Sequence, residues 1–548
     1  MTTRRKWLDN LLLAAAVFLL LALPRWLISA QYATADETKW VARAANFAYA
    51  LYHGSLADTY QSEHPGVTVM WAGAAGLTAL FPGYASAAPG PLEPYELDQF
   101  LQQQGYTPLQ ALVAGRKVMI ALNALALTLL FFYARRLLGQ TAAILAAAFM
   151  AFSPFLIAHT QLMHLDGLAG SLMLLSLLAF LAYAADRRVL DLLLAGIVAG
   201  LAWLTKTPAF ILGPILLVIA LLLARRQAAR PVLTAYLLWA VIGAITFLLF
   251  WPVMWSSPIS TMQRILAGAL SYAGGGHADP VFFNGIIYDD GRIPAQIFSF
   301  YPLTYLWRST PVIVIGLVLL APALWRRWPP LDQARPRGAT SILLLYALLF
   351  TLFMTLGDKK FDRYLLPIYP TLQLVAAVAW TALIQTAARR WFDGRVSRLA
   401  AGLLLGLVAV WQLVSLQRVF PYPLSYYNPL LGGSARAPQV MQIGWGEGLD
   451  AAGRYLSQKP DSSDLVVAGW YRSALAYYFD GQTLSINAEM SPEEVAAVEA
   501  ADYAVLYIHQ WQRGVPPALL AKFADRQPEE VIEINGLEYA RIYAASRR

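Results

Sequence analysis

Long apolar stretches separated by short polar connections dominate the first three quarters of the chain. A helix needs about 20 residues to cross the ~30 Å hydrocarbon core of a bilayer, and aromatic and basic residues mark its ends. Eleven stretches fit this description and predict transmembrane helices, at residues 8–28, 109–133, 140–158, 165–185, 189–205, 208–224, 232–252, 311–325, 340–357, 364–386 and 399–416. The first has no small-residue cleavage site after it, so we interpret it as a retained helix and not a signal peptide.

The distribution of basic residues divides the connections between the spans into two groups, one on each side of the membrane. The basic residues gather at the N-terminus and in alternate loops: Arg4, Arg5, Lys6, Arg135, Arg136, Arg187, Arg188, Arg225, Arg226, Arg230, Arg326, Arg327, Arg335, Arg337, Arg389, Arg390, Arg395 and Arg398. The positive-inside rule predicts that this side is cytoplasmic, so eleven spans place the C-terminus outside. The outer side has two long connections, at about 29–108 and 253–310. In the first, the hydrophobic segment 64–81 predicts a helix lying in or dipping into the outer interface.

The pattern changes at about Asp461, where short alternating segments replace membrane-like runs. Periodicity and capping residues predict strands at 465–467 and 503–508 and helices at 472–479 and 492–500. The predicted fold class is therefore an α-helical polytopic membrane protein with a small C-terminal extracytoplasmic α/β domain. Its predicted organisation is a transmembrane domain at 1–416, a linker at 417–460 and the α/β domain at 461–548.

Composition agrees with a membrane protein. Hydrophobic residues make up 58% of the 548 residues and charged residues only 14%, against about 25% in ordinary soluble proteins. This excludes a soluble globule and a disordered chain. The absence of cysteine removes disulfides, thiolate nucleophiles and cysteine metal sites. The net charge of +8 resides largely in the basic loops, so nucleic-acid binding is not favoured.

The ionisable residues within or beside the spans fall at their outer ends. Charges are costly in a membrane, so each is a candidate functional residue. Four carboxylates could take a proton from a hydroxyl: Asp36, Glu37, Glu63 and Asp166. Six cations could hold an anion such as phosphate: Lys206, Lys359, Lys360, Arg363, Arg292 and Arg308. Together they predict a polar cavity at the outer membrane surface, suited to group transfer from a lipid phosphate.

Each of these residues also has a structural interpretation. Asp36 or Thr34 could cap an interfacial helix, and Asp166 could cap the fourth span. The lysines could be interfacial anchors. Four histidines are expected near the outer surface and could bind a divalent metal, namely His64, His159, His164 and His277. Their spacing matches no tight metal-ligand motif. The sequence assigns no certain cofactor, and a metal stays unknown.

Five motifs resemble, in order, the GT-C integral-membrane glycosyltransferases, specifically the protein O-mannosyltransferase and aminoarabinose-transferase group of glycosyltransferase family 39. They are Ala35-Asp36-Glu37, Glu63-His64-Pro65-Gly66, Met163-His164-Leu165-Asp166, Leu204-Thr205-Lys206-Thr207-Pro208 and Lys359-Lys360-Phe361-Asp362-Arg363-Tyr364-Leu365-Leu366-Pro367. The resemblance covers roughly 1–416. Gly66 and Thr207 depart from the family pattern, which has Pro and Gly there. Segments 274–308, 426–430 and 444–448 look like a bacterial branch of unassigned substrate.

The resemblance implies transfer of a mannose-type hexose or similar sugar from a polyprenyl-phosphate donor, with inversion at the anomeric carbon. The acceptor would be a lipid, protein or glycan hydroxyl. By the same resemblance Asp36 is the general base, Glu63 and Asp166 orient the acceptor or the base, and Glu37 is supportive. The implied phosphate-binding residues are Lys206, Lys359, Lys360, Arg363 and Tyr364. The further donor or acceptor contacts expected are His64, His164, Arg292 and Arg308.

Three other functions remain compatible with the sequence. A transporter or flippase of lipid-linked sugars is also polytopic, but would be expected to carry mid-span charges and internal pseudo-symmetry. A non-catalytic membrane scaffold would tolerate loss of the outer carboxylates. Among enzymes, the nearest alternative is an oligosaccharide ligase or polymerase with a pyrophosphate-linked donor. Donor chemistry separates this alternative from a monophosphate-dependent transferase.

Overall fold

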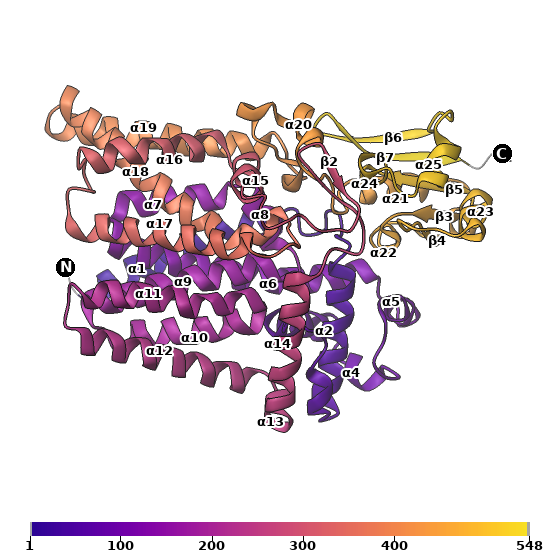
Figure 1. The fold of residues 1–548 in the computed structure, drawn as a ribbon, viewed down its shortest axis with the longest axis horizontal. Coiled ribbons are helices and arrows are strands. Elements are labelled where there is room, and N and C mark those ends of the chain that lie inside the picture. The colour runs from indigo at the N-terminus through magenta and orange to yellow at the C-terminus, as the bar shows by residue number, and fades with distance from the viewer. Residues whose placement is uncertain (1–2, 545–548) are drawn as a thin grey trace.

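Helices running side by side form most of the molecule, with a smaller sheet domain at one end (Figure 1). The computed structural model describes residues 3–544. The side chains of Arg4, Arg5 and Lys6 lie outside that description. The bundle helices are α1 (Thr3–Trp26), α6 (Pro108–Leu138), α7 (Gln140–Ala151), α8 (Pro154–Gln161), α9 (Leu165–Asp186), α10 (Val189–Thr205), α11 (Leu212–Ala224), α12 (Ala229–Phe250), α16 (Pro311–Trp325), α17 (Ala334–Thr355), α18 (Tyr369–Trp391) and α19 (Gly394–Gln417).

Every stretch predicted to span the membrane is helical. Within residues 3–544, eight helical segments are long and apolar enough to cross a bilayer. Helices α7 and α8 form a further candidate, bent by 66° at the break between them. The other two predicted spans are the shorter apolar helices α10, with 17 residues, and α16, with 15. The protein is a multi-pass membrane protein.

The first long connection folds into helices that cover one end of the bundle. These are α2 (Glu37–Tyr52), α3 (Val67–Leu80), α4 (Tyr84–Ala87) and α5 (Pro94–Gln103). Helix α3, the predicted interfacial helix, has 14 residues and is therefore about 21 Å long, too short to cross the bilayer core. It lies against α6, where a Cβ on Gly76 would come within 2.5 Å of the Ala114 backbone. Only glycine permits so close an approach.

The second long connection continues this layer. It comprises α13 (Val253–Ser256), α14 (Pro258–Gly274), a hairpin of β1 (Val281–Phe283) and β2 (Ile286–Tyr288), and α15 (Phe300–Arg308). Helices α2 and α14 run across the bundle instead of along it (Figure 1). The two connections therefore meet at the bundle end that faces the sheet domain.

The C-terminal residues form the predicted small α/β domain. Its sheet has the strand order β4-β3-β5-β7-β6, with β3 parallel to β4 and β5, and with β7 antiparallel to β5 and β6. The strands are β3 (Val466–Gly469), β4 (Gln482–Ser485), β5 (Tyr503–Tyr507), β6 (Glu530–Ile534) and β7 (Leu537–Ala544). The helices after α19 are α20 (Gly433–Arg436), α21 (Leu449–Leu456), α22 (Arg472–Ala476), α23 (Pro492–Ala500), α24 (Ile508–Arg513) and α25 (Pro517–Phe523).

Short 3₁₀ turns connect several of these elements. They are η1 (Leu56–Thr59), η2 (Thr207–Ile211), η3 (Asp362–Ile368), η4 (Pro423–Ser425), η5 (Pro429–Leu431), η6 (Ala437–Gln439) and η7 (Ser462–Asp464). Two of them matter for the site, because η2 follows Lys206 and η3 begins at Asp362. Both lie where a bundle helix meets the covering layer.

The segment before the sheet domain is tied to the loop between α1 and α2. Gly446 has φ of +124° and lies so close to Ala33 that an added Cβ would come within 2.2 Å of its carbonyl oxygen. The Gln31 side chain donates a hydrogen bond of 2.8 Å to Asp450. The sheet domain is thus held directly over the first connection.

Candidate active site

Asp36 immediately precedes α2, with its side chain turned into a cavity. It makes no capping hydrogen bond to the helix. The hydrogen bonds at the start of the helix are made by the neighbouring residues. The Thr34 backbone N–H and hydroxyl both donate to the Glu37 carboxylate, at 3.0 and 3.1 Å. The Asp36 side chain is 36% exposed. It is therefore free to meet a ligand.

Glu37 is locked in a buried ion pair with Arg116 of α6. The Arg116 Nε–Glu37 Oε1 distance is 2.7 Å, and both side chains have no exposed surface. Arg116 also donates to the backbone carbonyls of Ser29, Gln31 and Tyr32, and Glu37 accepts from the Met163 backbone N–H. Glu37 is consequently unable to touch a substrate. The pair fixes the loop that presents Asp36.

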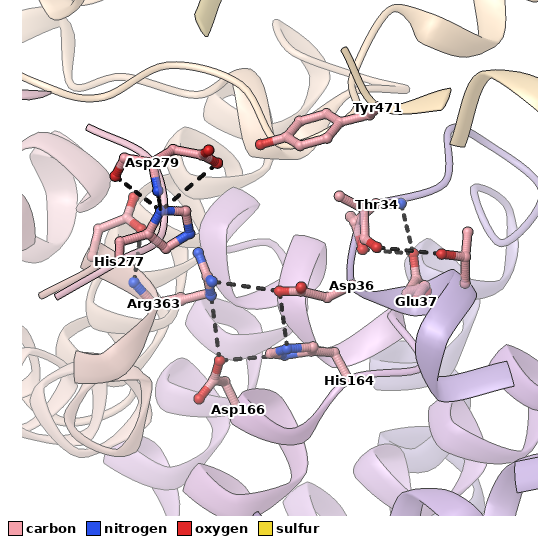
Figure 2. A network of polar contacts seen from close by, with 12 residues as sticks. Thr34, Asp36, Glu37, His164, Asp166, His277, Asp279, Arg363 and Tyr471 are labelled. Carbon is pink, nitrogen blue, oxygen red and sulfur yellow. Dashed lines mark hydrogen bonds and ion pairs between the residues drawn. The ribbon is translucent and has the colours of Figure 1, made fainter. Parts of the chain in front are cut away.

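Two carboxylates, Asp36 and Asp166, are linked through Arg363 and His164 at the base of the cavity (Figure 2). Arg363, in η3, lies between Asp36 and Asp166, with Nη2 3.5 Å from Asp36 Oδ2 and Nε 3.7 Å from Asp166 Oδ2. Lys206 Nζ donates to the other oxygen of Asp166. His164 joins the same carboxylates, with Nε2 3.7 Å from Asp36 and Nδ1 3.3 Å from Asp166.

Burial and nearby charges shift the pKa values of two groups at the cavity, Asp36 and His64. Burial would raise the pKa of Asp36, but the Arg363 guanidinium beside it outweighs burial and holds the pKa below its usual value. Burial, together with the nearby Lys206 charge, lowers the pKa of His64 to about 3. Asp36 is therefore ionised and His64 neutral near pH 7. His64 Nδ1 lies 2.8 Å from the Thr207 hydroxyl.

The cavity at these residues has a volume of about 570 Å³ and is lined by the first connection, the segment 277–279 before β1 and the sheet domain. A second, mainly apolar groove of about 240 Å³ adjoins it. Both are lined by His64, Lys206, Tyr272, Lys359 and Tyr364. Beyond these shared residues the groove is lined by Phe353, Met354 and Leu356 of the α17 end. Charged and apolar compartments thus meet at Lys206 and Lys359.

Comparison with known proteins agrees with this architecture. Residues 110–255 match the family model described as dolichyl-phosphate-mannose-protein mannosyltransferase. The structure of ArnT from Cupriavidus metallidurans bound to undecaprenyl phosphate is similar over 97% of this chain and 98% of that chain, at 16% identity and a TM-score of 0.50. The apo ArnT structure matches at 15% identity over 100% and 99% of the two chains, with a TM-score of 0.51. The chain therefore shares the fold of the ArnT structures, and part of it matches a glycosyltransferase family model.

More distant similarity extends to an archaeal enzyme. The Archaeoglobus fulgidus oligosaccharyltransferase matches over 92% of this chain and 70% of that chain, at 12% identity and a TM-score of 0.45. No curated protein matches the sequence.

Six of the predicted residues lie in the cavity lining or pair with residues of that lining. They are Asp36, Asp166, Lys206, Arg363, His64 and His164. Lys359 and Tyr364 lie beside them, because Lys359 Nζ is 4.4 Å from the Tyr272 ring centre and Lys206 Nζ is 4.2 Å from that of Tyr364. Seven of these eight residues line the 570 Å³ cavity, and buried Asp166 is bonded to one of them, Lys206.

Four other predicted residues have different surroundings. Glu63 is exposed and packs on α14 at Gly268, and Arg292 is exposed without a side-chain bond to any described residue. Buried Arg308 donates to Asp362 at 2.7 Å and to the Leu424 carbonyl. Lys360 Nζ donates to the carbonyls of Ile293 and Gly357. Arg308 and Lys360 therefore tie the covering layers together.

Sequence reasoning missed the cavity wall supplied by the C-terminal part. The Arg363 guanidinium lies over the Trp445 ring at 4.3 Å, and Tyr471 and His509 also line the cavity. The one local signal was the glycine-rich segment 444–448, whose Gly446 requires a positive φ. No group of three or more His, Asp or Glu side chains within residues 3–544 is arranged to hold a metal ion.

We predict that the Glu37–Arg116 pair is required for stability. Glu37→Gln leaves the Arg116 charge buried without its partner, which typically costs about 3–5 kcal/mol. The expected result is a Tm several degrees lower in thermal unfolding of the detergent-solubilised protein. Exposed Glu63→Gln is the matched control and should unfold like the wild type. Equal Tm values for Glu37→Gln and the wild type would contradict the structural role of the pair.

Proposed function

We propose that the protein transfers a sugar from a polyprenyl-phosphate donor to an acceptor hydroxyl, with Asp36 as the general base. The observation that carries the proposal is the arrangement of one partly exposed carboxylate beside a buried cationic cluster, where a polar cavity opens onto an apolar groove. A donor with a charged head and a long apolar tail matches both compartments. The exposed carboxylate leaves room for an acceptor.

The donor phosphate would lie among Lys206, Lys359 and Arg363. The adjoining groove would take the first isoprenoid units, and the exposed side chains of Phe353 and Leu356 mark its edge toward the lipid. ArnT, which shares this fold, was crystallised with undecaprenyl phosphate, a lipid of the same chemical class. We assign Tyr364 to the wall between head and tail, and His164 to orienting Asp36.

Charge counting favours a monophosphate donor. Lys206 and Arg363 pair with Asp36 and Asp166, and Lys359 lines the same cavity. These three cations and two carboxylates together carry one net positive charge. A polyprenyl-phosphate sugar is a phosphodiester with one negative charge. When Asp36 takes a proton, the cluster gains a second net positive charge. That balances the released phosphate monoester, whose charge approaches −2 near neutral pH.

The chemical step is a single displacement. As the acceptor oxygen attacks the anomeric carbon, its proton passes to the Asp36 carboxylate, and the bond from that carbon to the phosphate oxygen breaks. The electron pair of the broken bond goes to polyprenyl phosphate, which the three cations stabilise. Attack opposite the leaving group inverts the configuration. The pKa of Asp36, held low by Arg363, keeps the base ionised before each turnover.

We also propose an orientation in the membrane. The described Arg-rich loops join helices at the end of the bundle near the N-terminus, whereas the sheet domain lies at the opposite end (Figure 1). The positive-inside rule then places the N-terminus in the cytoplasm, and the cavity and sheet domain outside. A lipid-linked donor would present its phosphate there at headgroup level.

Loss of the base should nearly abolish transfer. Asp36→Asn keeps the size of the side chain but removes the proton acceptor, so we expect a rate about 10²–10⁴-fold lower. The measurement is release of polyprenyl phosphate from a panel of polyprenyl-phosphate sugars, with a cell-envelope extract as acceptor source. Glu63→Gln is the control, because Glu63 lies outside the cavity and its loss should leave the rate within about twofold.

Two results would contradict the proposal. Asp36→Asn activity within a few-fold of the wild type would exclude Asp36 as the base. Release from pyrophosphate-linked donors but from no monophosphate-linked donor would assign the protein to the ligase or polymerase class.

The proposed orientation can be tested by cysteine labelling, since the sequence contains no cysteine. Ala496→Cys places a thiol on an exposed position of α23, and Ala228→Cys places one in the basic loop between α11 and α12. In right-side-out vesicles, an impermeant maleimide should label Ala496→Cys at once and Ala228→Cys only after permeabilisation. The reverse pattern would overturn the orientation.

A further inference from the structure

The sheet domain places a tyrosine hydroxyl over the candidate catalytic groups. Tyr471 follows β3 and lines the 570 Å³ cavity together with Asp36 and Arg363. Figure 2 shows its ring above the Arg363–Asp36 pair, with the hydroxyl end near Asp279. The charges of Asp36, Asp279, Arg363 and Arg513 all act on this phenol. Tyr471 thus faces the reacting groups from the wall opposite Asp166.

The hydrogen bonds around Tyr471 fix the direction in which its hydroxyl points. His509 Nε2 lies 2.6 Å from the Gly444 carbonyl oxygen, which can only accept, so Nε2 carries the proton. Burial lowers the pKa of His509 well below its usual value, so the ring is neutral and Nδ1 is an acceptor. Tyr471 therefore donates its hydroxyl proton to His509 Nδ1, at 2.9 Å. Its oxygen faces the cavity only as an acceptor.

The supporting residues hold this arrangement rigidly. Arg513, 3% exposed, donates from Nε to the His509 carbonyl and from Nη1 to the Pro280 carbonyl. It thereby fixes α24 to the segment before β1, whose residues 277–279 line another part of the cavity. His509, itself 2% exposed, has no room to rotate away from Tyr471. The phenol oxygen is consequently preorganised before any substrate arrives.

We infer that Tyr471 is an acceptor-positioning residue, which accepts a hydrogen bond from a second hydroxyl or amino group of the acceptor while Asp36 deprotonates the reacting hydroxyl. This inference rests on the proposed function and assigns the sheet domain to acceptor selection. The donor head is accounted for by the cations around Lys206 at the membrane side of the cavity. The sheet-domain wall is left for the acceptor. The site thus selects polyhydroxylated or amino-bearing acceptors over simple alcohols.

The test compares two simple acceptor probes, hexyl glucoside and 1-hexanol, with polyprenyl-phosphate mannose as donor. Tyr471→Phe removes only the hydroxyl group. We expect kcat/KM for hexyl glucoside to fall about tenfold, as loss of one hydrogen bond predicts, with transfer to 1-hexanol and the donor KM unchanged. Tyr543→Phe, a buried position of the same sheet, is the matched control and should leave both probes unaffected.

The outcomes separate the inference from the function on which it rests. An equal loss for both probes, a changed donor KM, or unchanged transfer to hexyl glucoside would overturn the role of Tyr471 while leaving the glycosyl transfer intact. Absence of polyprenyl phosphate release by the wild type, from this donor and from the wider donor panel, would overturn the proposed function and this role together.

Discussion

The buried ion pair between Glu37 and Arg116 is the constraint on which the site depends. Arg116 holds three carbonyls of the loop before α2, and Glu37 holds Thr34 and the backbone of Met163. Two charges without exposed surface are costly unless every hydrogen-bonding group finds a partner, and here the loop backbone supplies the partners. The ion pair fixes the backbone of this loop in a position from which the adjacent Asp36 carboxylate lines the cavity. Structural and chemical roles are thus divided between neighbouring acidic residues.

Cations and carboxylates on the cavity floor hold each other in place before a ligand binds. Asp166 bonds Lys206 and lies near Arg363, so it counteracts the mutual repulsion of the two cations that the proposed donor phosphate requires. Such preorganised charges act strongly because they need little rearrangement during the reaction. The apolar groove adjoins them at Lys206, and the sheet domain covers them. Each compartment therefore matches one part of a lipid-linked sugar and its acceptor.

The sequence predicted the spans and the main polar cluster because both have strong local signals. Long apolar runs identify helices, and charges at their ends stand out against an apolar background. Residue type does not determine the direction in which a side chain points, so Glu63 and Arg308 are grouped with the site from the sequence alone. In the structure Glu63 packs against α14, and Arg308 pairs with Asp362. The β6–β7 hairpin carried a usable signal in Asn535-Gly536, both of positive φ. Tyr471 had none, since only tertiary packing brings it over Asp36.

The most direct measurement is an experimental structure of the protein with polyprenyl phosphate bound, determined in a lipid nanodisc. The central claim is that the cationic cluster holds the donor phosphate beside Asp36, with the tail in the adjoining groove. The account predicts phosphate density in contact with Lys206, Lys359 and Arg363, and isoprenoid density along Tyr272 and Phe353. Phosphate density elsewhere, with Lys206 and Arg363 still paired only to Asp36 and Asp166, would contradict it.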